Sequence, residues 1–534
     1  MKATFKPLSL AIAVSAATAG YVGTVNAQAV VVPAPALAGN TGLGDLAIVP
    51  YYTVREDWTT GVSVINTSSL TQVIKVRLRR ATDSMDALDF NVVMSPNDVW
   101  TGYIENNTAP GVEDQIRFYT NDNTCTVPIA TPNPEGGPGY FPVPDVFADF
   151  AEEGYIEIIG MGAADATQPI SRDALHSSEG FPLFCDLLQA NFRAFGTRDV
   201  KNAPVAAQPS PLNLTLDGNI SSTQTYAQGR LSNYTAPGNF MKVSYFIKDT
   251  TSGIEMGDNA VLVSDFMDGA SMTNQLPALA VGEDLQGYDF PDLDGGAPLS
   301  AGDAGAATTG RFQLLRNILS STGIINDWSK NDAGAFTVDT DWVITAPGQY
   351  TMLKTPRYLL SLADGYDAAG AGPNALCAKI AVGPITRCDY RDLPLRITPL
   401  VFDREEQSEV IPPDEIVISP TPSNPRNPDD LVYEVNVIEW GNAPVLDAAA
   451  SLKLNVDLAG AQYGWANIAL SSRNADPRVC AYPTGTAGVI EPVCNTVTGE
   501  APIVGFAAWQ RNFTANPDAN YGRIIRHSYT VSSS

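Results

Sequence analysis

Hydrophobic and polar residues alternate over short runs along most of the chain, and residues 42–104 show the pattern most clearly. Segments rich in Val, Ile and aromatic residues are separated there by clusters of Gly, Asn, Asp, Ser and Pro. This arrangement is typical of β-strands joined by tight turns. It predicts strands at residues 61–65, 74–80, 88–94 and 99–104.

The segment 74–80 alternates without a break. Its two sets of positions hold Ile74, Val76 and Leu78 on one side and Lys75, Arg77 and Arg79 on the other. Successive side chains of a strand point to opposite faces of the sheet. We therefore expect this strand to bury its aliphatic row and to present its cationic row to water.

The remaining chain carries the same kind of pattern and predicts a mainly β fold. Residues 310–321 are the exception, because their apolar positions share one helical face. We expect two or more Ig-like β-sandwich domains with long loops and one or two short helices. The predicted organisation is an N-terminal sandwich at 28–270, a loop and helix connector at 271–330, and a C-terminal sandwich at 331–534.

The first residues have the features of an export signal. Lys2 and Lys6 precede and border an apolar run at residues 8–19, and Val25-Asn26-Ala27 has the small-x-small pattern of a cleavage site. The run is too short to span a bilayer, and no later apolar run reaches the necessary length. Residues 1–27 therefore predict a cleaved Sec signal peptide on an exported, cell-surface or extracellular protein without an integral membrane span.

The chain is strongly acidic, with 58 Asp and Glu against 32 Lys and Arg and a formal net charge of −26. This excess repels nucleic acid and bare anionic lipid, so neither is expected as a direct partner. It also favours the binding of divalent cations. The strand patterns and the 44% hydrophobic content argue against disorder.

Six cysteines in an exported chain predict disulfide bonds, although six cysteines allow 15 pairings. Sequence separation favours two local pairs and one distant pair. These are Cys377 with Cys388, Cys480 with Cys494, and Cys125 with Cys185.

Calcium is the metal that the sequence suggests. Asp289, Asp292 and Asp294 lie in a loop that ends in Gly295 and Gly296, a loose relative of calcium-binding loops. The Glu that closes an EF-hand loop is missing, so that motif is not assigned. A solvated acidic loop remains the alternative to a calcium site.

The cationic row of Lys75, Arg77 and Arg79, together with Arg80, has two readings. It is either a contact for acidic faces of neighbouring copies or for glycolipid phosphates, or it pairs with acidic residues across strands of the same molecule. The aromatic residues nearby also have two readings, as sugar-stacking groups or as members of the core. They are Tyr51, Tyr52, Trp58 and Trp100.

Catalytic motifs are not evident in the sequence. It has no nucleophile elbow, no zinc-protease helix and no P-loop. Its two histidines, His176 and His527, are both expected to be surface or cap residues. We therefore expect a protein that is not an enzyme.

The strings GLGDLAIVPYYTVREDWTTGVSVINTS, VIKVRLRR, ALDFNVVMSPNDVWTGYI, EGYIEIIGMG, TDWVIT and FDREE, with the export signal, give the chain its most informative likeness. It resembles the surface-layer (S-layer) proteins of marine Gammaproteobacteria that also form biofilm matrix. The resemblance implies a non-enzymatic protein that self-assembles into a paracrystalline coat on the outer membrane. It implies no catalytic residues.

Two other functions share parts of this pattern. A secreted adhesin or polysaccharide-binding β-sandwich protein would have the same export signal and strands. An outer-membrane β-barrel would too, but such barrels have longer alternating strands and aromatic girdles. Here the connections are rich in proline, and the chain ends in Tyr-Thr-Val-Ser-Ser-Ser.

Overall fold

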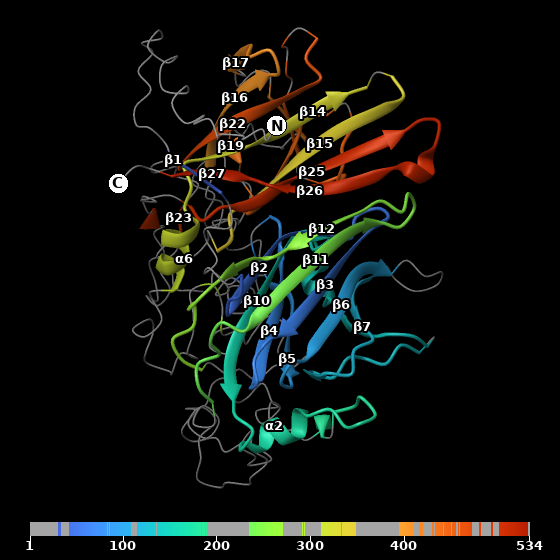
Figure 1. Cartoon of the computed structure of the whole chain (residues 1–534), viewed down its shortest axis with the longest axis vertical. Coiled ribbons are helices and arrows are strands. Elements are labelled where there is room, and N and C mark those ends of the chain that lie inside the picture. Colours follow the sequence, from blue (N-terminus) through green and yellow to red (C-terminus); the bar gives the residue numbers. More distant parts are fainter. Residues whose placement is uncertain are drawn as a thin grey trace, which may run out of the picture.

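The computed structural model describes somewhat more than half of the chain. Described residues are 30–33, 42–107, 115–188, 234–270, 311–348, 395–410, 416–419, 430–472, 480–481, 493–494 and 501–531, apart from single positions, with residues 291 and 293. The described part consists mainly of antiparallel strands that form two stacked β-sandwiches (Figure 1). The predicted mainly β, sandwich-rich fold class is confirmed. Residues 1–27, the predicted signal peptide, lie outside the described part.

The first sandwich consists of two six-stranded antiparallel sheets. One has the order β13-β2-β10-β4-β5-β8, formed by Val261–Val263, Leu46–Thr53, Glu153–Ala164, Thr71–Arg80, Asp86–Met94 and Cys125–Val127. The other has the order β12-β11-β3-β6-β7-β9, formed by Glu255–Asn259, Met241–Asp249, Trp58–Asn66, Val99–Asn107, Gln115–Thr120 and Gly139–Pro142.

The core of this sandwich comes from the inward positions of both sheets. Ile74, Val76 and Leu78 of β4 belong to it, as the alternation predicts, and each is fully buried. Phe90 of β5 packs edge-on against Trp100 of β6, with ring centroids 5.7 Å apart. Burial of these apolar side chains is the main force that holds the two sheets together.

The second sandwich is built from one sheet of 13 strands that folds over on itself. Its main path is β17-β16-β22-β14-β15-β20-β21-β18, and β1, β19, β25, β26 and β27 pair beside that path. The bounds along the path are Ser408–Val410, Leu395–Asp403, Tyr463–Ser472, Gly323–Asn331, Phe336–Thr345, Val435–Glu439, Ser451–Leu454 and Ile416–Ser419. The other strands are Val30–Pro33, Asp430–Leu431, Val504–Phe513, Tyr521–Arg526 and Ser528–Val531.

Three tryptophans occupy the centre of the second sandwich. Trp328, Trp342 and Trp440 are each at most 1% exposed. The rings of Trp342 and Trp440 lie 4.8 Å apart, and those of Trp328 and Trp440 lie 6.2 Å apart. Trp342 also donates its indole N–H to the carbonyl of Asp327 at 2.8 Å, so its burial leaves no unmet donor.

Helices are short in the described part. They are α1 at Asp145–Ala148, α2 at Pro169–Ala174, α6 at Arg311–Leu319 and the 3-10 turn η6 at Pro517–Ala519. The helix predicted at residues 310–321 is confirmed as α6. Its apolar face buries Leu315 and Leu319 in the first core.

Chain pairing differs from the predicted domain boundaries at two places. The strand β1, at Val30–Pro33, pairs with β27 near the other end of the chain and not with the first sandwich. The strand β14, at Gly323–Asn331, starts inside the predicted connector and pairs with β22, β27 and β15. Both strands complete the second sandwich, because backbone groups along a sheet edge bond to any extended segment that reaches them.

The two sandwiches share a continuous interface. Val343, Val435 and Phe506 of the second sandwich belong to the same hydrophobic cluster as the first core. The hydroxyl of Thr345 donates to the carbonyl of Pro50 at 2.6 Å. The amide of Val435 donates to the carbonyl of Ala81 at 3.0 Å. Apolar packing and backbone hydrogen bonds together make the two sandwiches one body.

Candidate functional site

The predicted cationic row on β4 is buried, so the expectation that it faces water is wrong. Lys75 and Arg77 are 0% exposed, and Arg79 is 4% exposed. The face of the sheet that carries them is covered as well, since Val73, Met161 and Ile170 form a second apolar cluster there. These side chains therefore offer no open surface to a neighbouring copy or to a glycolipid.

Carboxylates of the neighbouring strands neutralise this row. Lys75 Nζ lies 3.0 Å from Asp89 Oδ2. Arg77 Nη1 lies 3.4 Å from Glu157 Oε2, and Arg79 Nε donates to Glu157 Oε1 at 2.9 Å. Asp86 contacts both arginines. We name these three cations and three carboxylates the β4 ion cluster: Lys75, Arg77, Arg79, Asp86, Asp89 and Glu157.

The sheet register places the partners of the β4 ion cluster opposite one another. Arg77 stands across from Asp89 on β5 and from Glu157 on β10. Cross-strand pairing, the second reading of the row, is therefore what the structure shows. Arg80 is bonded differently, because its Nη1 donates to the backbone carbonyl of Asp149, at the end of α1, at 2.9 Å.

The aromatic residues near this strand belong to the core and not to a sugar site. Tyr51, Tyr52 and Trp100 are fully buried, and Trp58 is 6% exposed. The hydroxyl of Tyr51 donates to Glu153 Oε2 at 2.8 Å, and burial raises the pKa of this tyrosine. The two tyrosine hydroxyls are satisfied inside the molecule, since that of Tyr52 donates to the carbonyl of Ala151 at 3.0 Å. Because all four rings are buried, they cannot stack on an external ligand.

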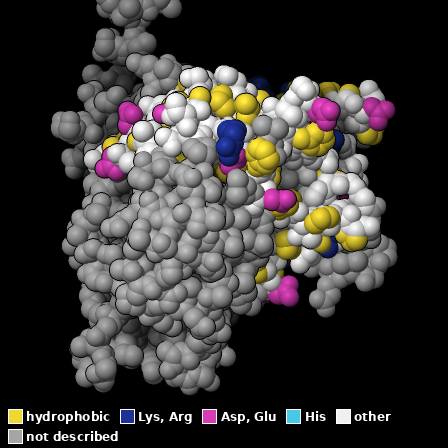
Figure 2. Space-filling model, turned by 90° about the horizontal axis from the view of Figure 1, so that it is seen from below, with side chains coloured by type: hydrophobic (Ala, Val, Ile, Leu, Met, Phe, Trp, Pro, Cys, Tyr) yellow, Lys and Arg dark blue, Asp and Glu magenta, His cyan; other side chains and the backbone are white. Residues whose placement is uncertain are grey.

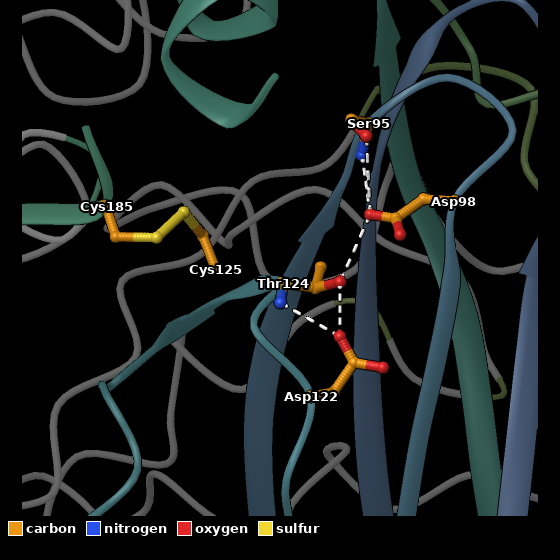
Figure 3. The surroundings of a disulfide bond; sticks show 6 residues. All are labelled: Ser95, Asp98, Asp122, Thr124, Cys125 and Cys185. Atoms are coloured by element: carbon orange, nitrogen blue, oxygen red, sulfur yellow. Dashed lines mark hydrogen bonds between the residues drawn. A yellow bond between two sulfur atoms is a disulfide. The ribbon is translucent and has the colours of Figure 1, made fainter. Parts of the chain in front are cut away.

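One of the three predicted disulfides is present. Cys125 of β8 is bonded to Cys185, with Cα atoms 5.3 Å apart and a separation of 60 positions in sequence. Figure 3 shows the neighbouring turn, where Thr124 donates its hydroxyl to Asp98 at 3.1 Å and to Asp122 at 2.8 Å. These bonds hold the start of β8 beside β5 and support the position of Cys125.

The described residues include two of the other four cysteines and none of the predicted calcium ligands. Cys480 and Cys494 are paired opposite each other in the short sheet of β23, Cys480–Ala481, and β24, Val493–Cys494. Their disulfide stays a prediction. Outside the described part lie the predicted pair of Cys377 and Cys388 and the three predicted calcium ligands, Asp289, Asp292 and Asp294. The described residues hold no cluster of three or more His, Cys, Asp or Glu suited to a metal ion.

The expectation that both histidines are surface or cap residues is wrong for His527, which is buried between strands. It is 1% exposed, and Asn326 Nδ2 donates to its Nδ1 at 2.9 Å. The proton is therefore on Nε2, which donates to the carbonyl of Val343 at 3.0 Å. Burial lowers the pKa of His527 to about 4, partly opposed by this bond. His176 is partly exposed, 3.9 Å from Asp98.

Two buried aspartates fasten loops in corresponding ways. Asp45 accepts hydrogen bonds from the amides of Phe266 and Met267 at 2.8 and 2.7 Å. Asp341 accepts from Val445 and Leu446 at 2.8 and 2.9 Å. Burial raises the pKa of Asp45 to about 6 and also raises that of Asp341, although the amides oppose both shifts. Both carboxylates therefore act as hydrogen-bond acceptors for loop amides inside the fold.

A different set of arginines and rings lies at the open end of β15, β25 and β26. The register sets Trp509 opposite Arg523 and Arg511 opposite Tyr521, while Phe336 faces Phe513. Because these positions are two apart along each strand, they share one face of the sheet. We name this set the arginine–aromatic platform: Phe336, Trp509, Arg511, Phe513, Tyr521 and Arg523.

Both arginines of the platform rest on aromatic rings. The Arg511 guanidinium lies 4.5 Å from the Phe336 centroid and 4.9 Å from that of Trp509. Arg523 lies 4.3 Å from the Trp509 centroid. Tyr521 is 42% exposed, so the outer part of the platform is open to solvent. Sequence reasoning missed this site, because its members come from three strands and its arginines have no distinctive spacing.

Comparison with known proteins adds no relative. No family model, no curated protein and no solved structure matches this chain. Within the part of the chain that the structure describes, no helix has the length and apolar character needed to cross a membrane.

Proposed function

We propose that this protein is a non-enzymatic structural component of a cell-surface layer, whose copies assemble into a two-dimensional lattice and contribute to biofilm matrix. The resemblance of its strand sequences to S-layer proteins gives the proposal its direction. A Sec signal at residues 1–27 would deliver the chain to the surface, and a cleaved form starting near Gln28 would be the assembling species.

The interface between the sandwiches is the observation that carries this proposal. A lattice repeats the same contacts in every direction, so each copy must hold its contact surfaces at a constant relative orientation. Val343, Val435 and Phe506 continue the first core into the second sandwich, and Arg526 of β26 pairs with Asp258 of β12 across the boundary. This body can position distant surfaces as one unit.

The net negative charge of the chain makes assembly depend on cations. With a net charge of −26, copies repel one another unless cations screen or bridge their acidic surfaces. On the face drawn in Figure 2, acidic side chains of the described part lie scattered and not gathered in one patch. We propose that calcium ions bridge such groups, with Asp289, Asp292 and Asp294 as the first candidates.

Electron microscopy of the purified mature chain tests the proposal. Ordered sheets with calcium, dispersed by a chelator, are the expected result. Sheets that persist in the chelator would exclude calcium and leave the lattice. A chain that stays dispersed at high concentration in every divalent cation, or that turns over a substrate, would overturn the structural function.

One observation favours the polysaccharide-binding alternative. Trp465 of β22 is 40% exposed and stacks on Phe402 of β16, with centroids 4.2 Å apart and an interplanar angle of 7°. Flat exposed rings of this kind can stack on the apolar face of a sugar. Glycan binding that is abolished by Trp465→Ala, by a protein that never forms sheets, would establish this alternative instead.

A further inference from the structure

The two arginines of the arginine–aromatic platform have no acidic partner within the described part of the chain, unlike the arginines of the β4 ion cluster. Neither Arg511 nor Arg523 makes a hydrogen bond or an ion pair within the described part of the chain, and their contacts are those with rings. Arg511 Nε is also inaccessible and unbonded. By contrast, Arg526 on the same strand as Arg523 is bonded to Asp258.

Stacking on a ring stabilises the face of an arginine guanidinium but provides no acceptor for its N–H groups. A guanidinium that lies over an aromatic face gains electrostatic attraction from the ring, but its N–H groups lie in the guanidinium plane and remain able to donate. Carboxylates fit this edge in a bidentate way. Trp509 therefore holds both guanidinium groups in place, and the exposed Arg523 keeps its donors available, while the Nε of Arg511 is covered.

We propose that the arginine–aromatic platform docks onto the acidic surface of a second copy of this chain. This inference rests on the proposed function, because it names the surface through which copies meet. Charge complementarity favours this occupant, since every copy carries 58 acidic residues against 32 basic ones. Exposed rings such as Tyr521 add apolar area to the contact, as aromatic residues and arginine do at protein interfaces.

The described part of the chain already offers one acidic surface of this kind. Glu56, Asp57 and Asp447 are exposed, and the neighbouring Arg55 donates from its Nε to the backbone carbonyl of Asp447 at 3.0 Å. The pKa of Asp447 is raised by partial burial and then by the negative charge of Glu56. An incoming guanidinium would relieve this repulsion.

The test uses the mature full chain with Arg511→Gln and Arg523→Gln together. We expect the concentration needed for sheet formation to rise at least tenfold, with unchanged thermal unfolding. Arg117→Gln is the matched control. Arg117 also lies over a ring, 4.3 Å from the Tyr140 centroid, but it donates to Gln115 within its own molecule. Sheets of the control should form as in the wild type.

Each outcome decides a separate point. Wild-type lattice formation by the double variant, or an equal loss in the Arg117 control, would overturn the platform contact and leave the proposed function standing. A wild-type chain that forms no sheets defeats the proposed function. Sedimentation velocity then tests the platform alone, since arginine-dependent self-association of the soluble chain would support it and a monomer would not.

An acidic saccharide is the rival occupant. Oligogalacturonate titrated into the wild type and the double variant, followed by tryptophan fluorescence, distinguishes it from a second copy. Binding that needs both arginines while sheets of the double variant form normally would assign the platform to a saccharide and overturn the proposal. Absent binding, together with impaired sheets, supports the second copy.

Discussion

The β4 ion cluster and the arginine–aromatic platform use the same residue type in opposite ways. On β4, Arg77 and Arg79 are buried and contact carboxylates of two neighbouring strands. On β25 and β26, Arg511 and Arg523 lie over rings, and none of the carboxylates that the structure describes is within ion-pair distance of them. The difference shows that a strand's polar row is not necessarily a solvent-facing row, because its environment depends on what covers that face of the sheet.

Burial sets the energetic contrast between the two regions. A charge removed from water loses several kcal/mol of solvation, which only close partners of opposite sign can offset. The three cations of the β4 ion cluster meet three carboxylates, so the group is balanced. Arg523 is exposed and keeps its solvation, and a ring beneath it contributes only about 0.5–1 kcal/mol. Removing a partner should therefore cost far more at β4.

The largest expected effect comes from Glu157→Gln. The substitution keeps the shape of the side chain but leaves Arg77 and Arg79 without their shared carboxylate. Breaking a buried ion pair in this way costs about 3–5 kcal/mol. The free energy of unfolding, measured with guanidinium chloride, should fall by that amount. Glu255→Gln at an exposed position of β12 is the control, with a change within about 0.5 kcal/mol. Equal effects at both positions would contradict the comparison.

The disulfide comes next in magnitude. Replacing Cys125 and Cys185 together by Ser opens a loop of 60 residues, which is expected to lower the free energy of unfolding by about 2–4 kcal/mol. The wild type in reducing buffer should lose at least as much, because the other predicted disulfides are opened as well. The β4 ion cluster and this disulfide lie on the same sheet, so a larger loss in the double variant would mean that the ion cluster is disturbed as well.

A pH titration compares buried groups of the two sandwiches. The pKa of His527 is lowered from 6.5 to about 4, so its contribution to stability is complete above pH 6.5 and is lost as the pH falls to about 4. The pKa of Asp45 is raised from 3.8 to about 6, so its contribution has the opposite sign and is gained as the pH falls from about 6 to 3.8. Each amounts to about 3 kcal/mol, and the two largely cancel.

Asp45→Asn separates these contributions. The variant should lose about 3 kcal/mol more than the wild type between pH 6.5 and pH 4, because it lacks the stabilising protonation of Asp45 over this range. Urea unfolding at a series of pH values measures the difference. His527→Gln should give a deviation of the opposite sign. Parallel stability profiles for the wild type and Asp45→Asn would show that burial does not raise the pKa of Asp45.

The local pattern of hydrophobic and polar residues was sufficient to predict the strands but not to predict which side chains they pair with. The alternation in residues 74–80 correctly placed Ile74, Val76 and Leu78 in the core, since it depends only on the two-residue period of a strand. The partner of Arg77 and Arg79 is Glu157, about 80 positions away, and sheet register brought it there. The period alone cannot say whether the second face of a sheet is covered.

The arginine–aromatic platform and the pairing of the two chain ends could not be predicted from the sequence, for the same reason. Phe336, Trp509 and Arg523 become neighbours only after β15, β25 and β26 have paired. The pairing of β1 with β27 joins residues near opposite ends of the chain. The burial of His527 likewise depends on a contact with Val343 of another strand. Short-range signals carry no information about contacts of this separation, and such contacts form the candidate interaction surface.

The smallest expected effect lies at the boundary between the sandwiches, where Arg526 joins β26 to Asp258 of β12. The side chains of this pair are 34% and 24% exposed, so water screens their attraction, and the pKa of Arg526 is raised mainly by its hydrogen bond to Asp258. We expect Arg526→Gln to lower the free energy of unfolding by about 1 kcal/mol, well below the loss at Glu157.

Calorimetry of this variant also tests the continuity of the two cores. Val343 and Phe506 pack in the cluster of the first sandwich whether or not the ion pair is present, so the variant should still unfold in one transition. Two separate transitions would mean that Arg526 and Asp258 are what couples the sandwiches. The rigid body on which lattice assembly depends would then rest on a single exposed ion pair, and the variant should lose ordered sheets along with its single transition.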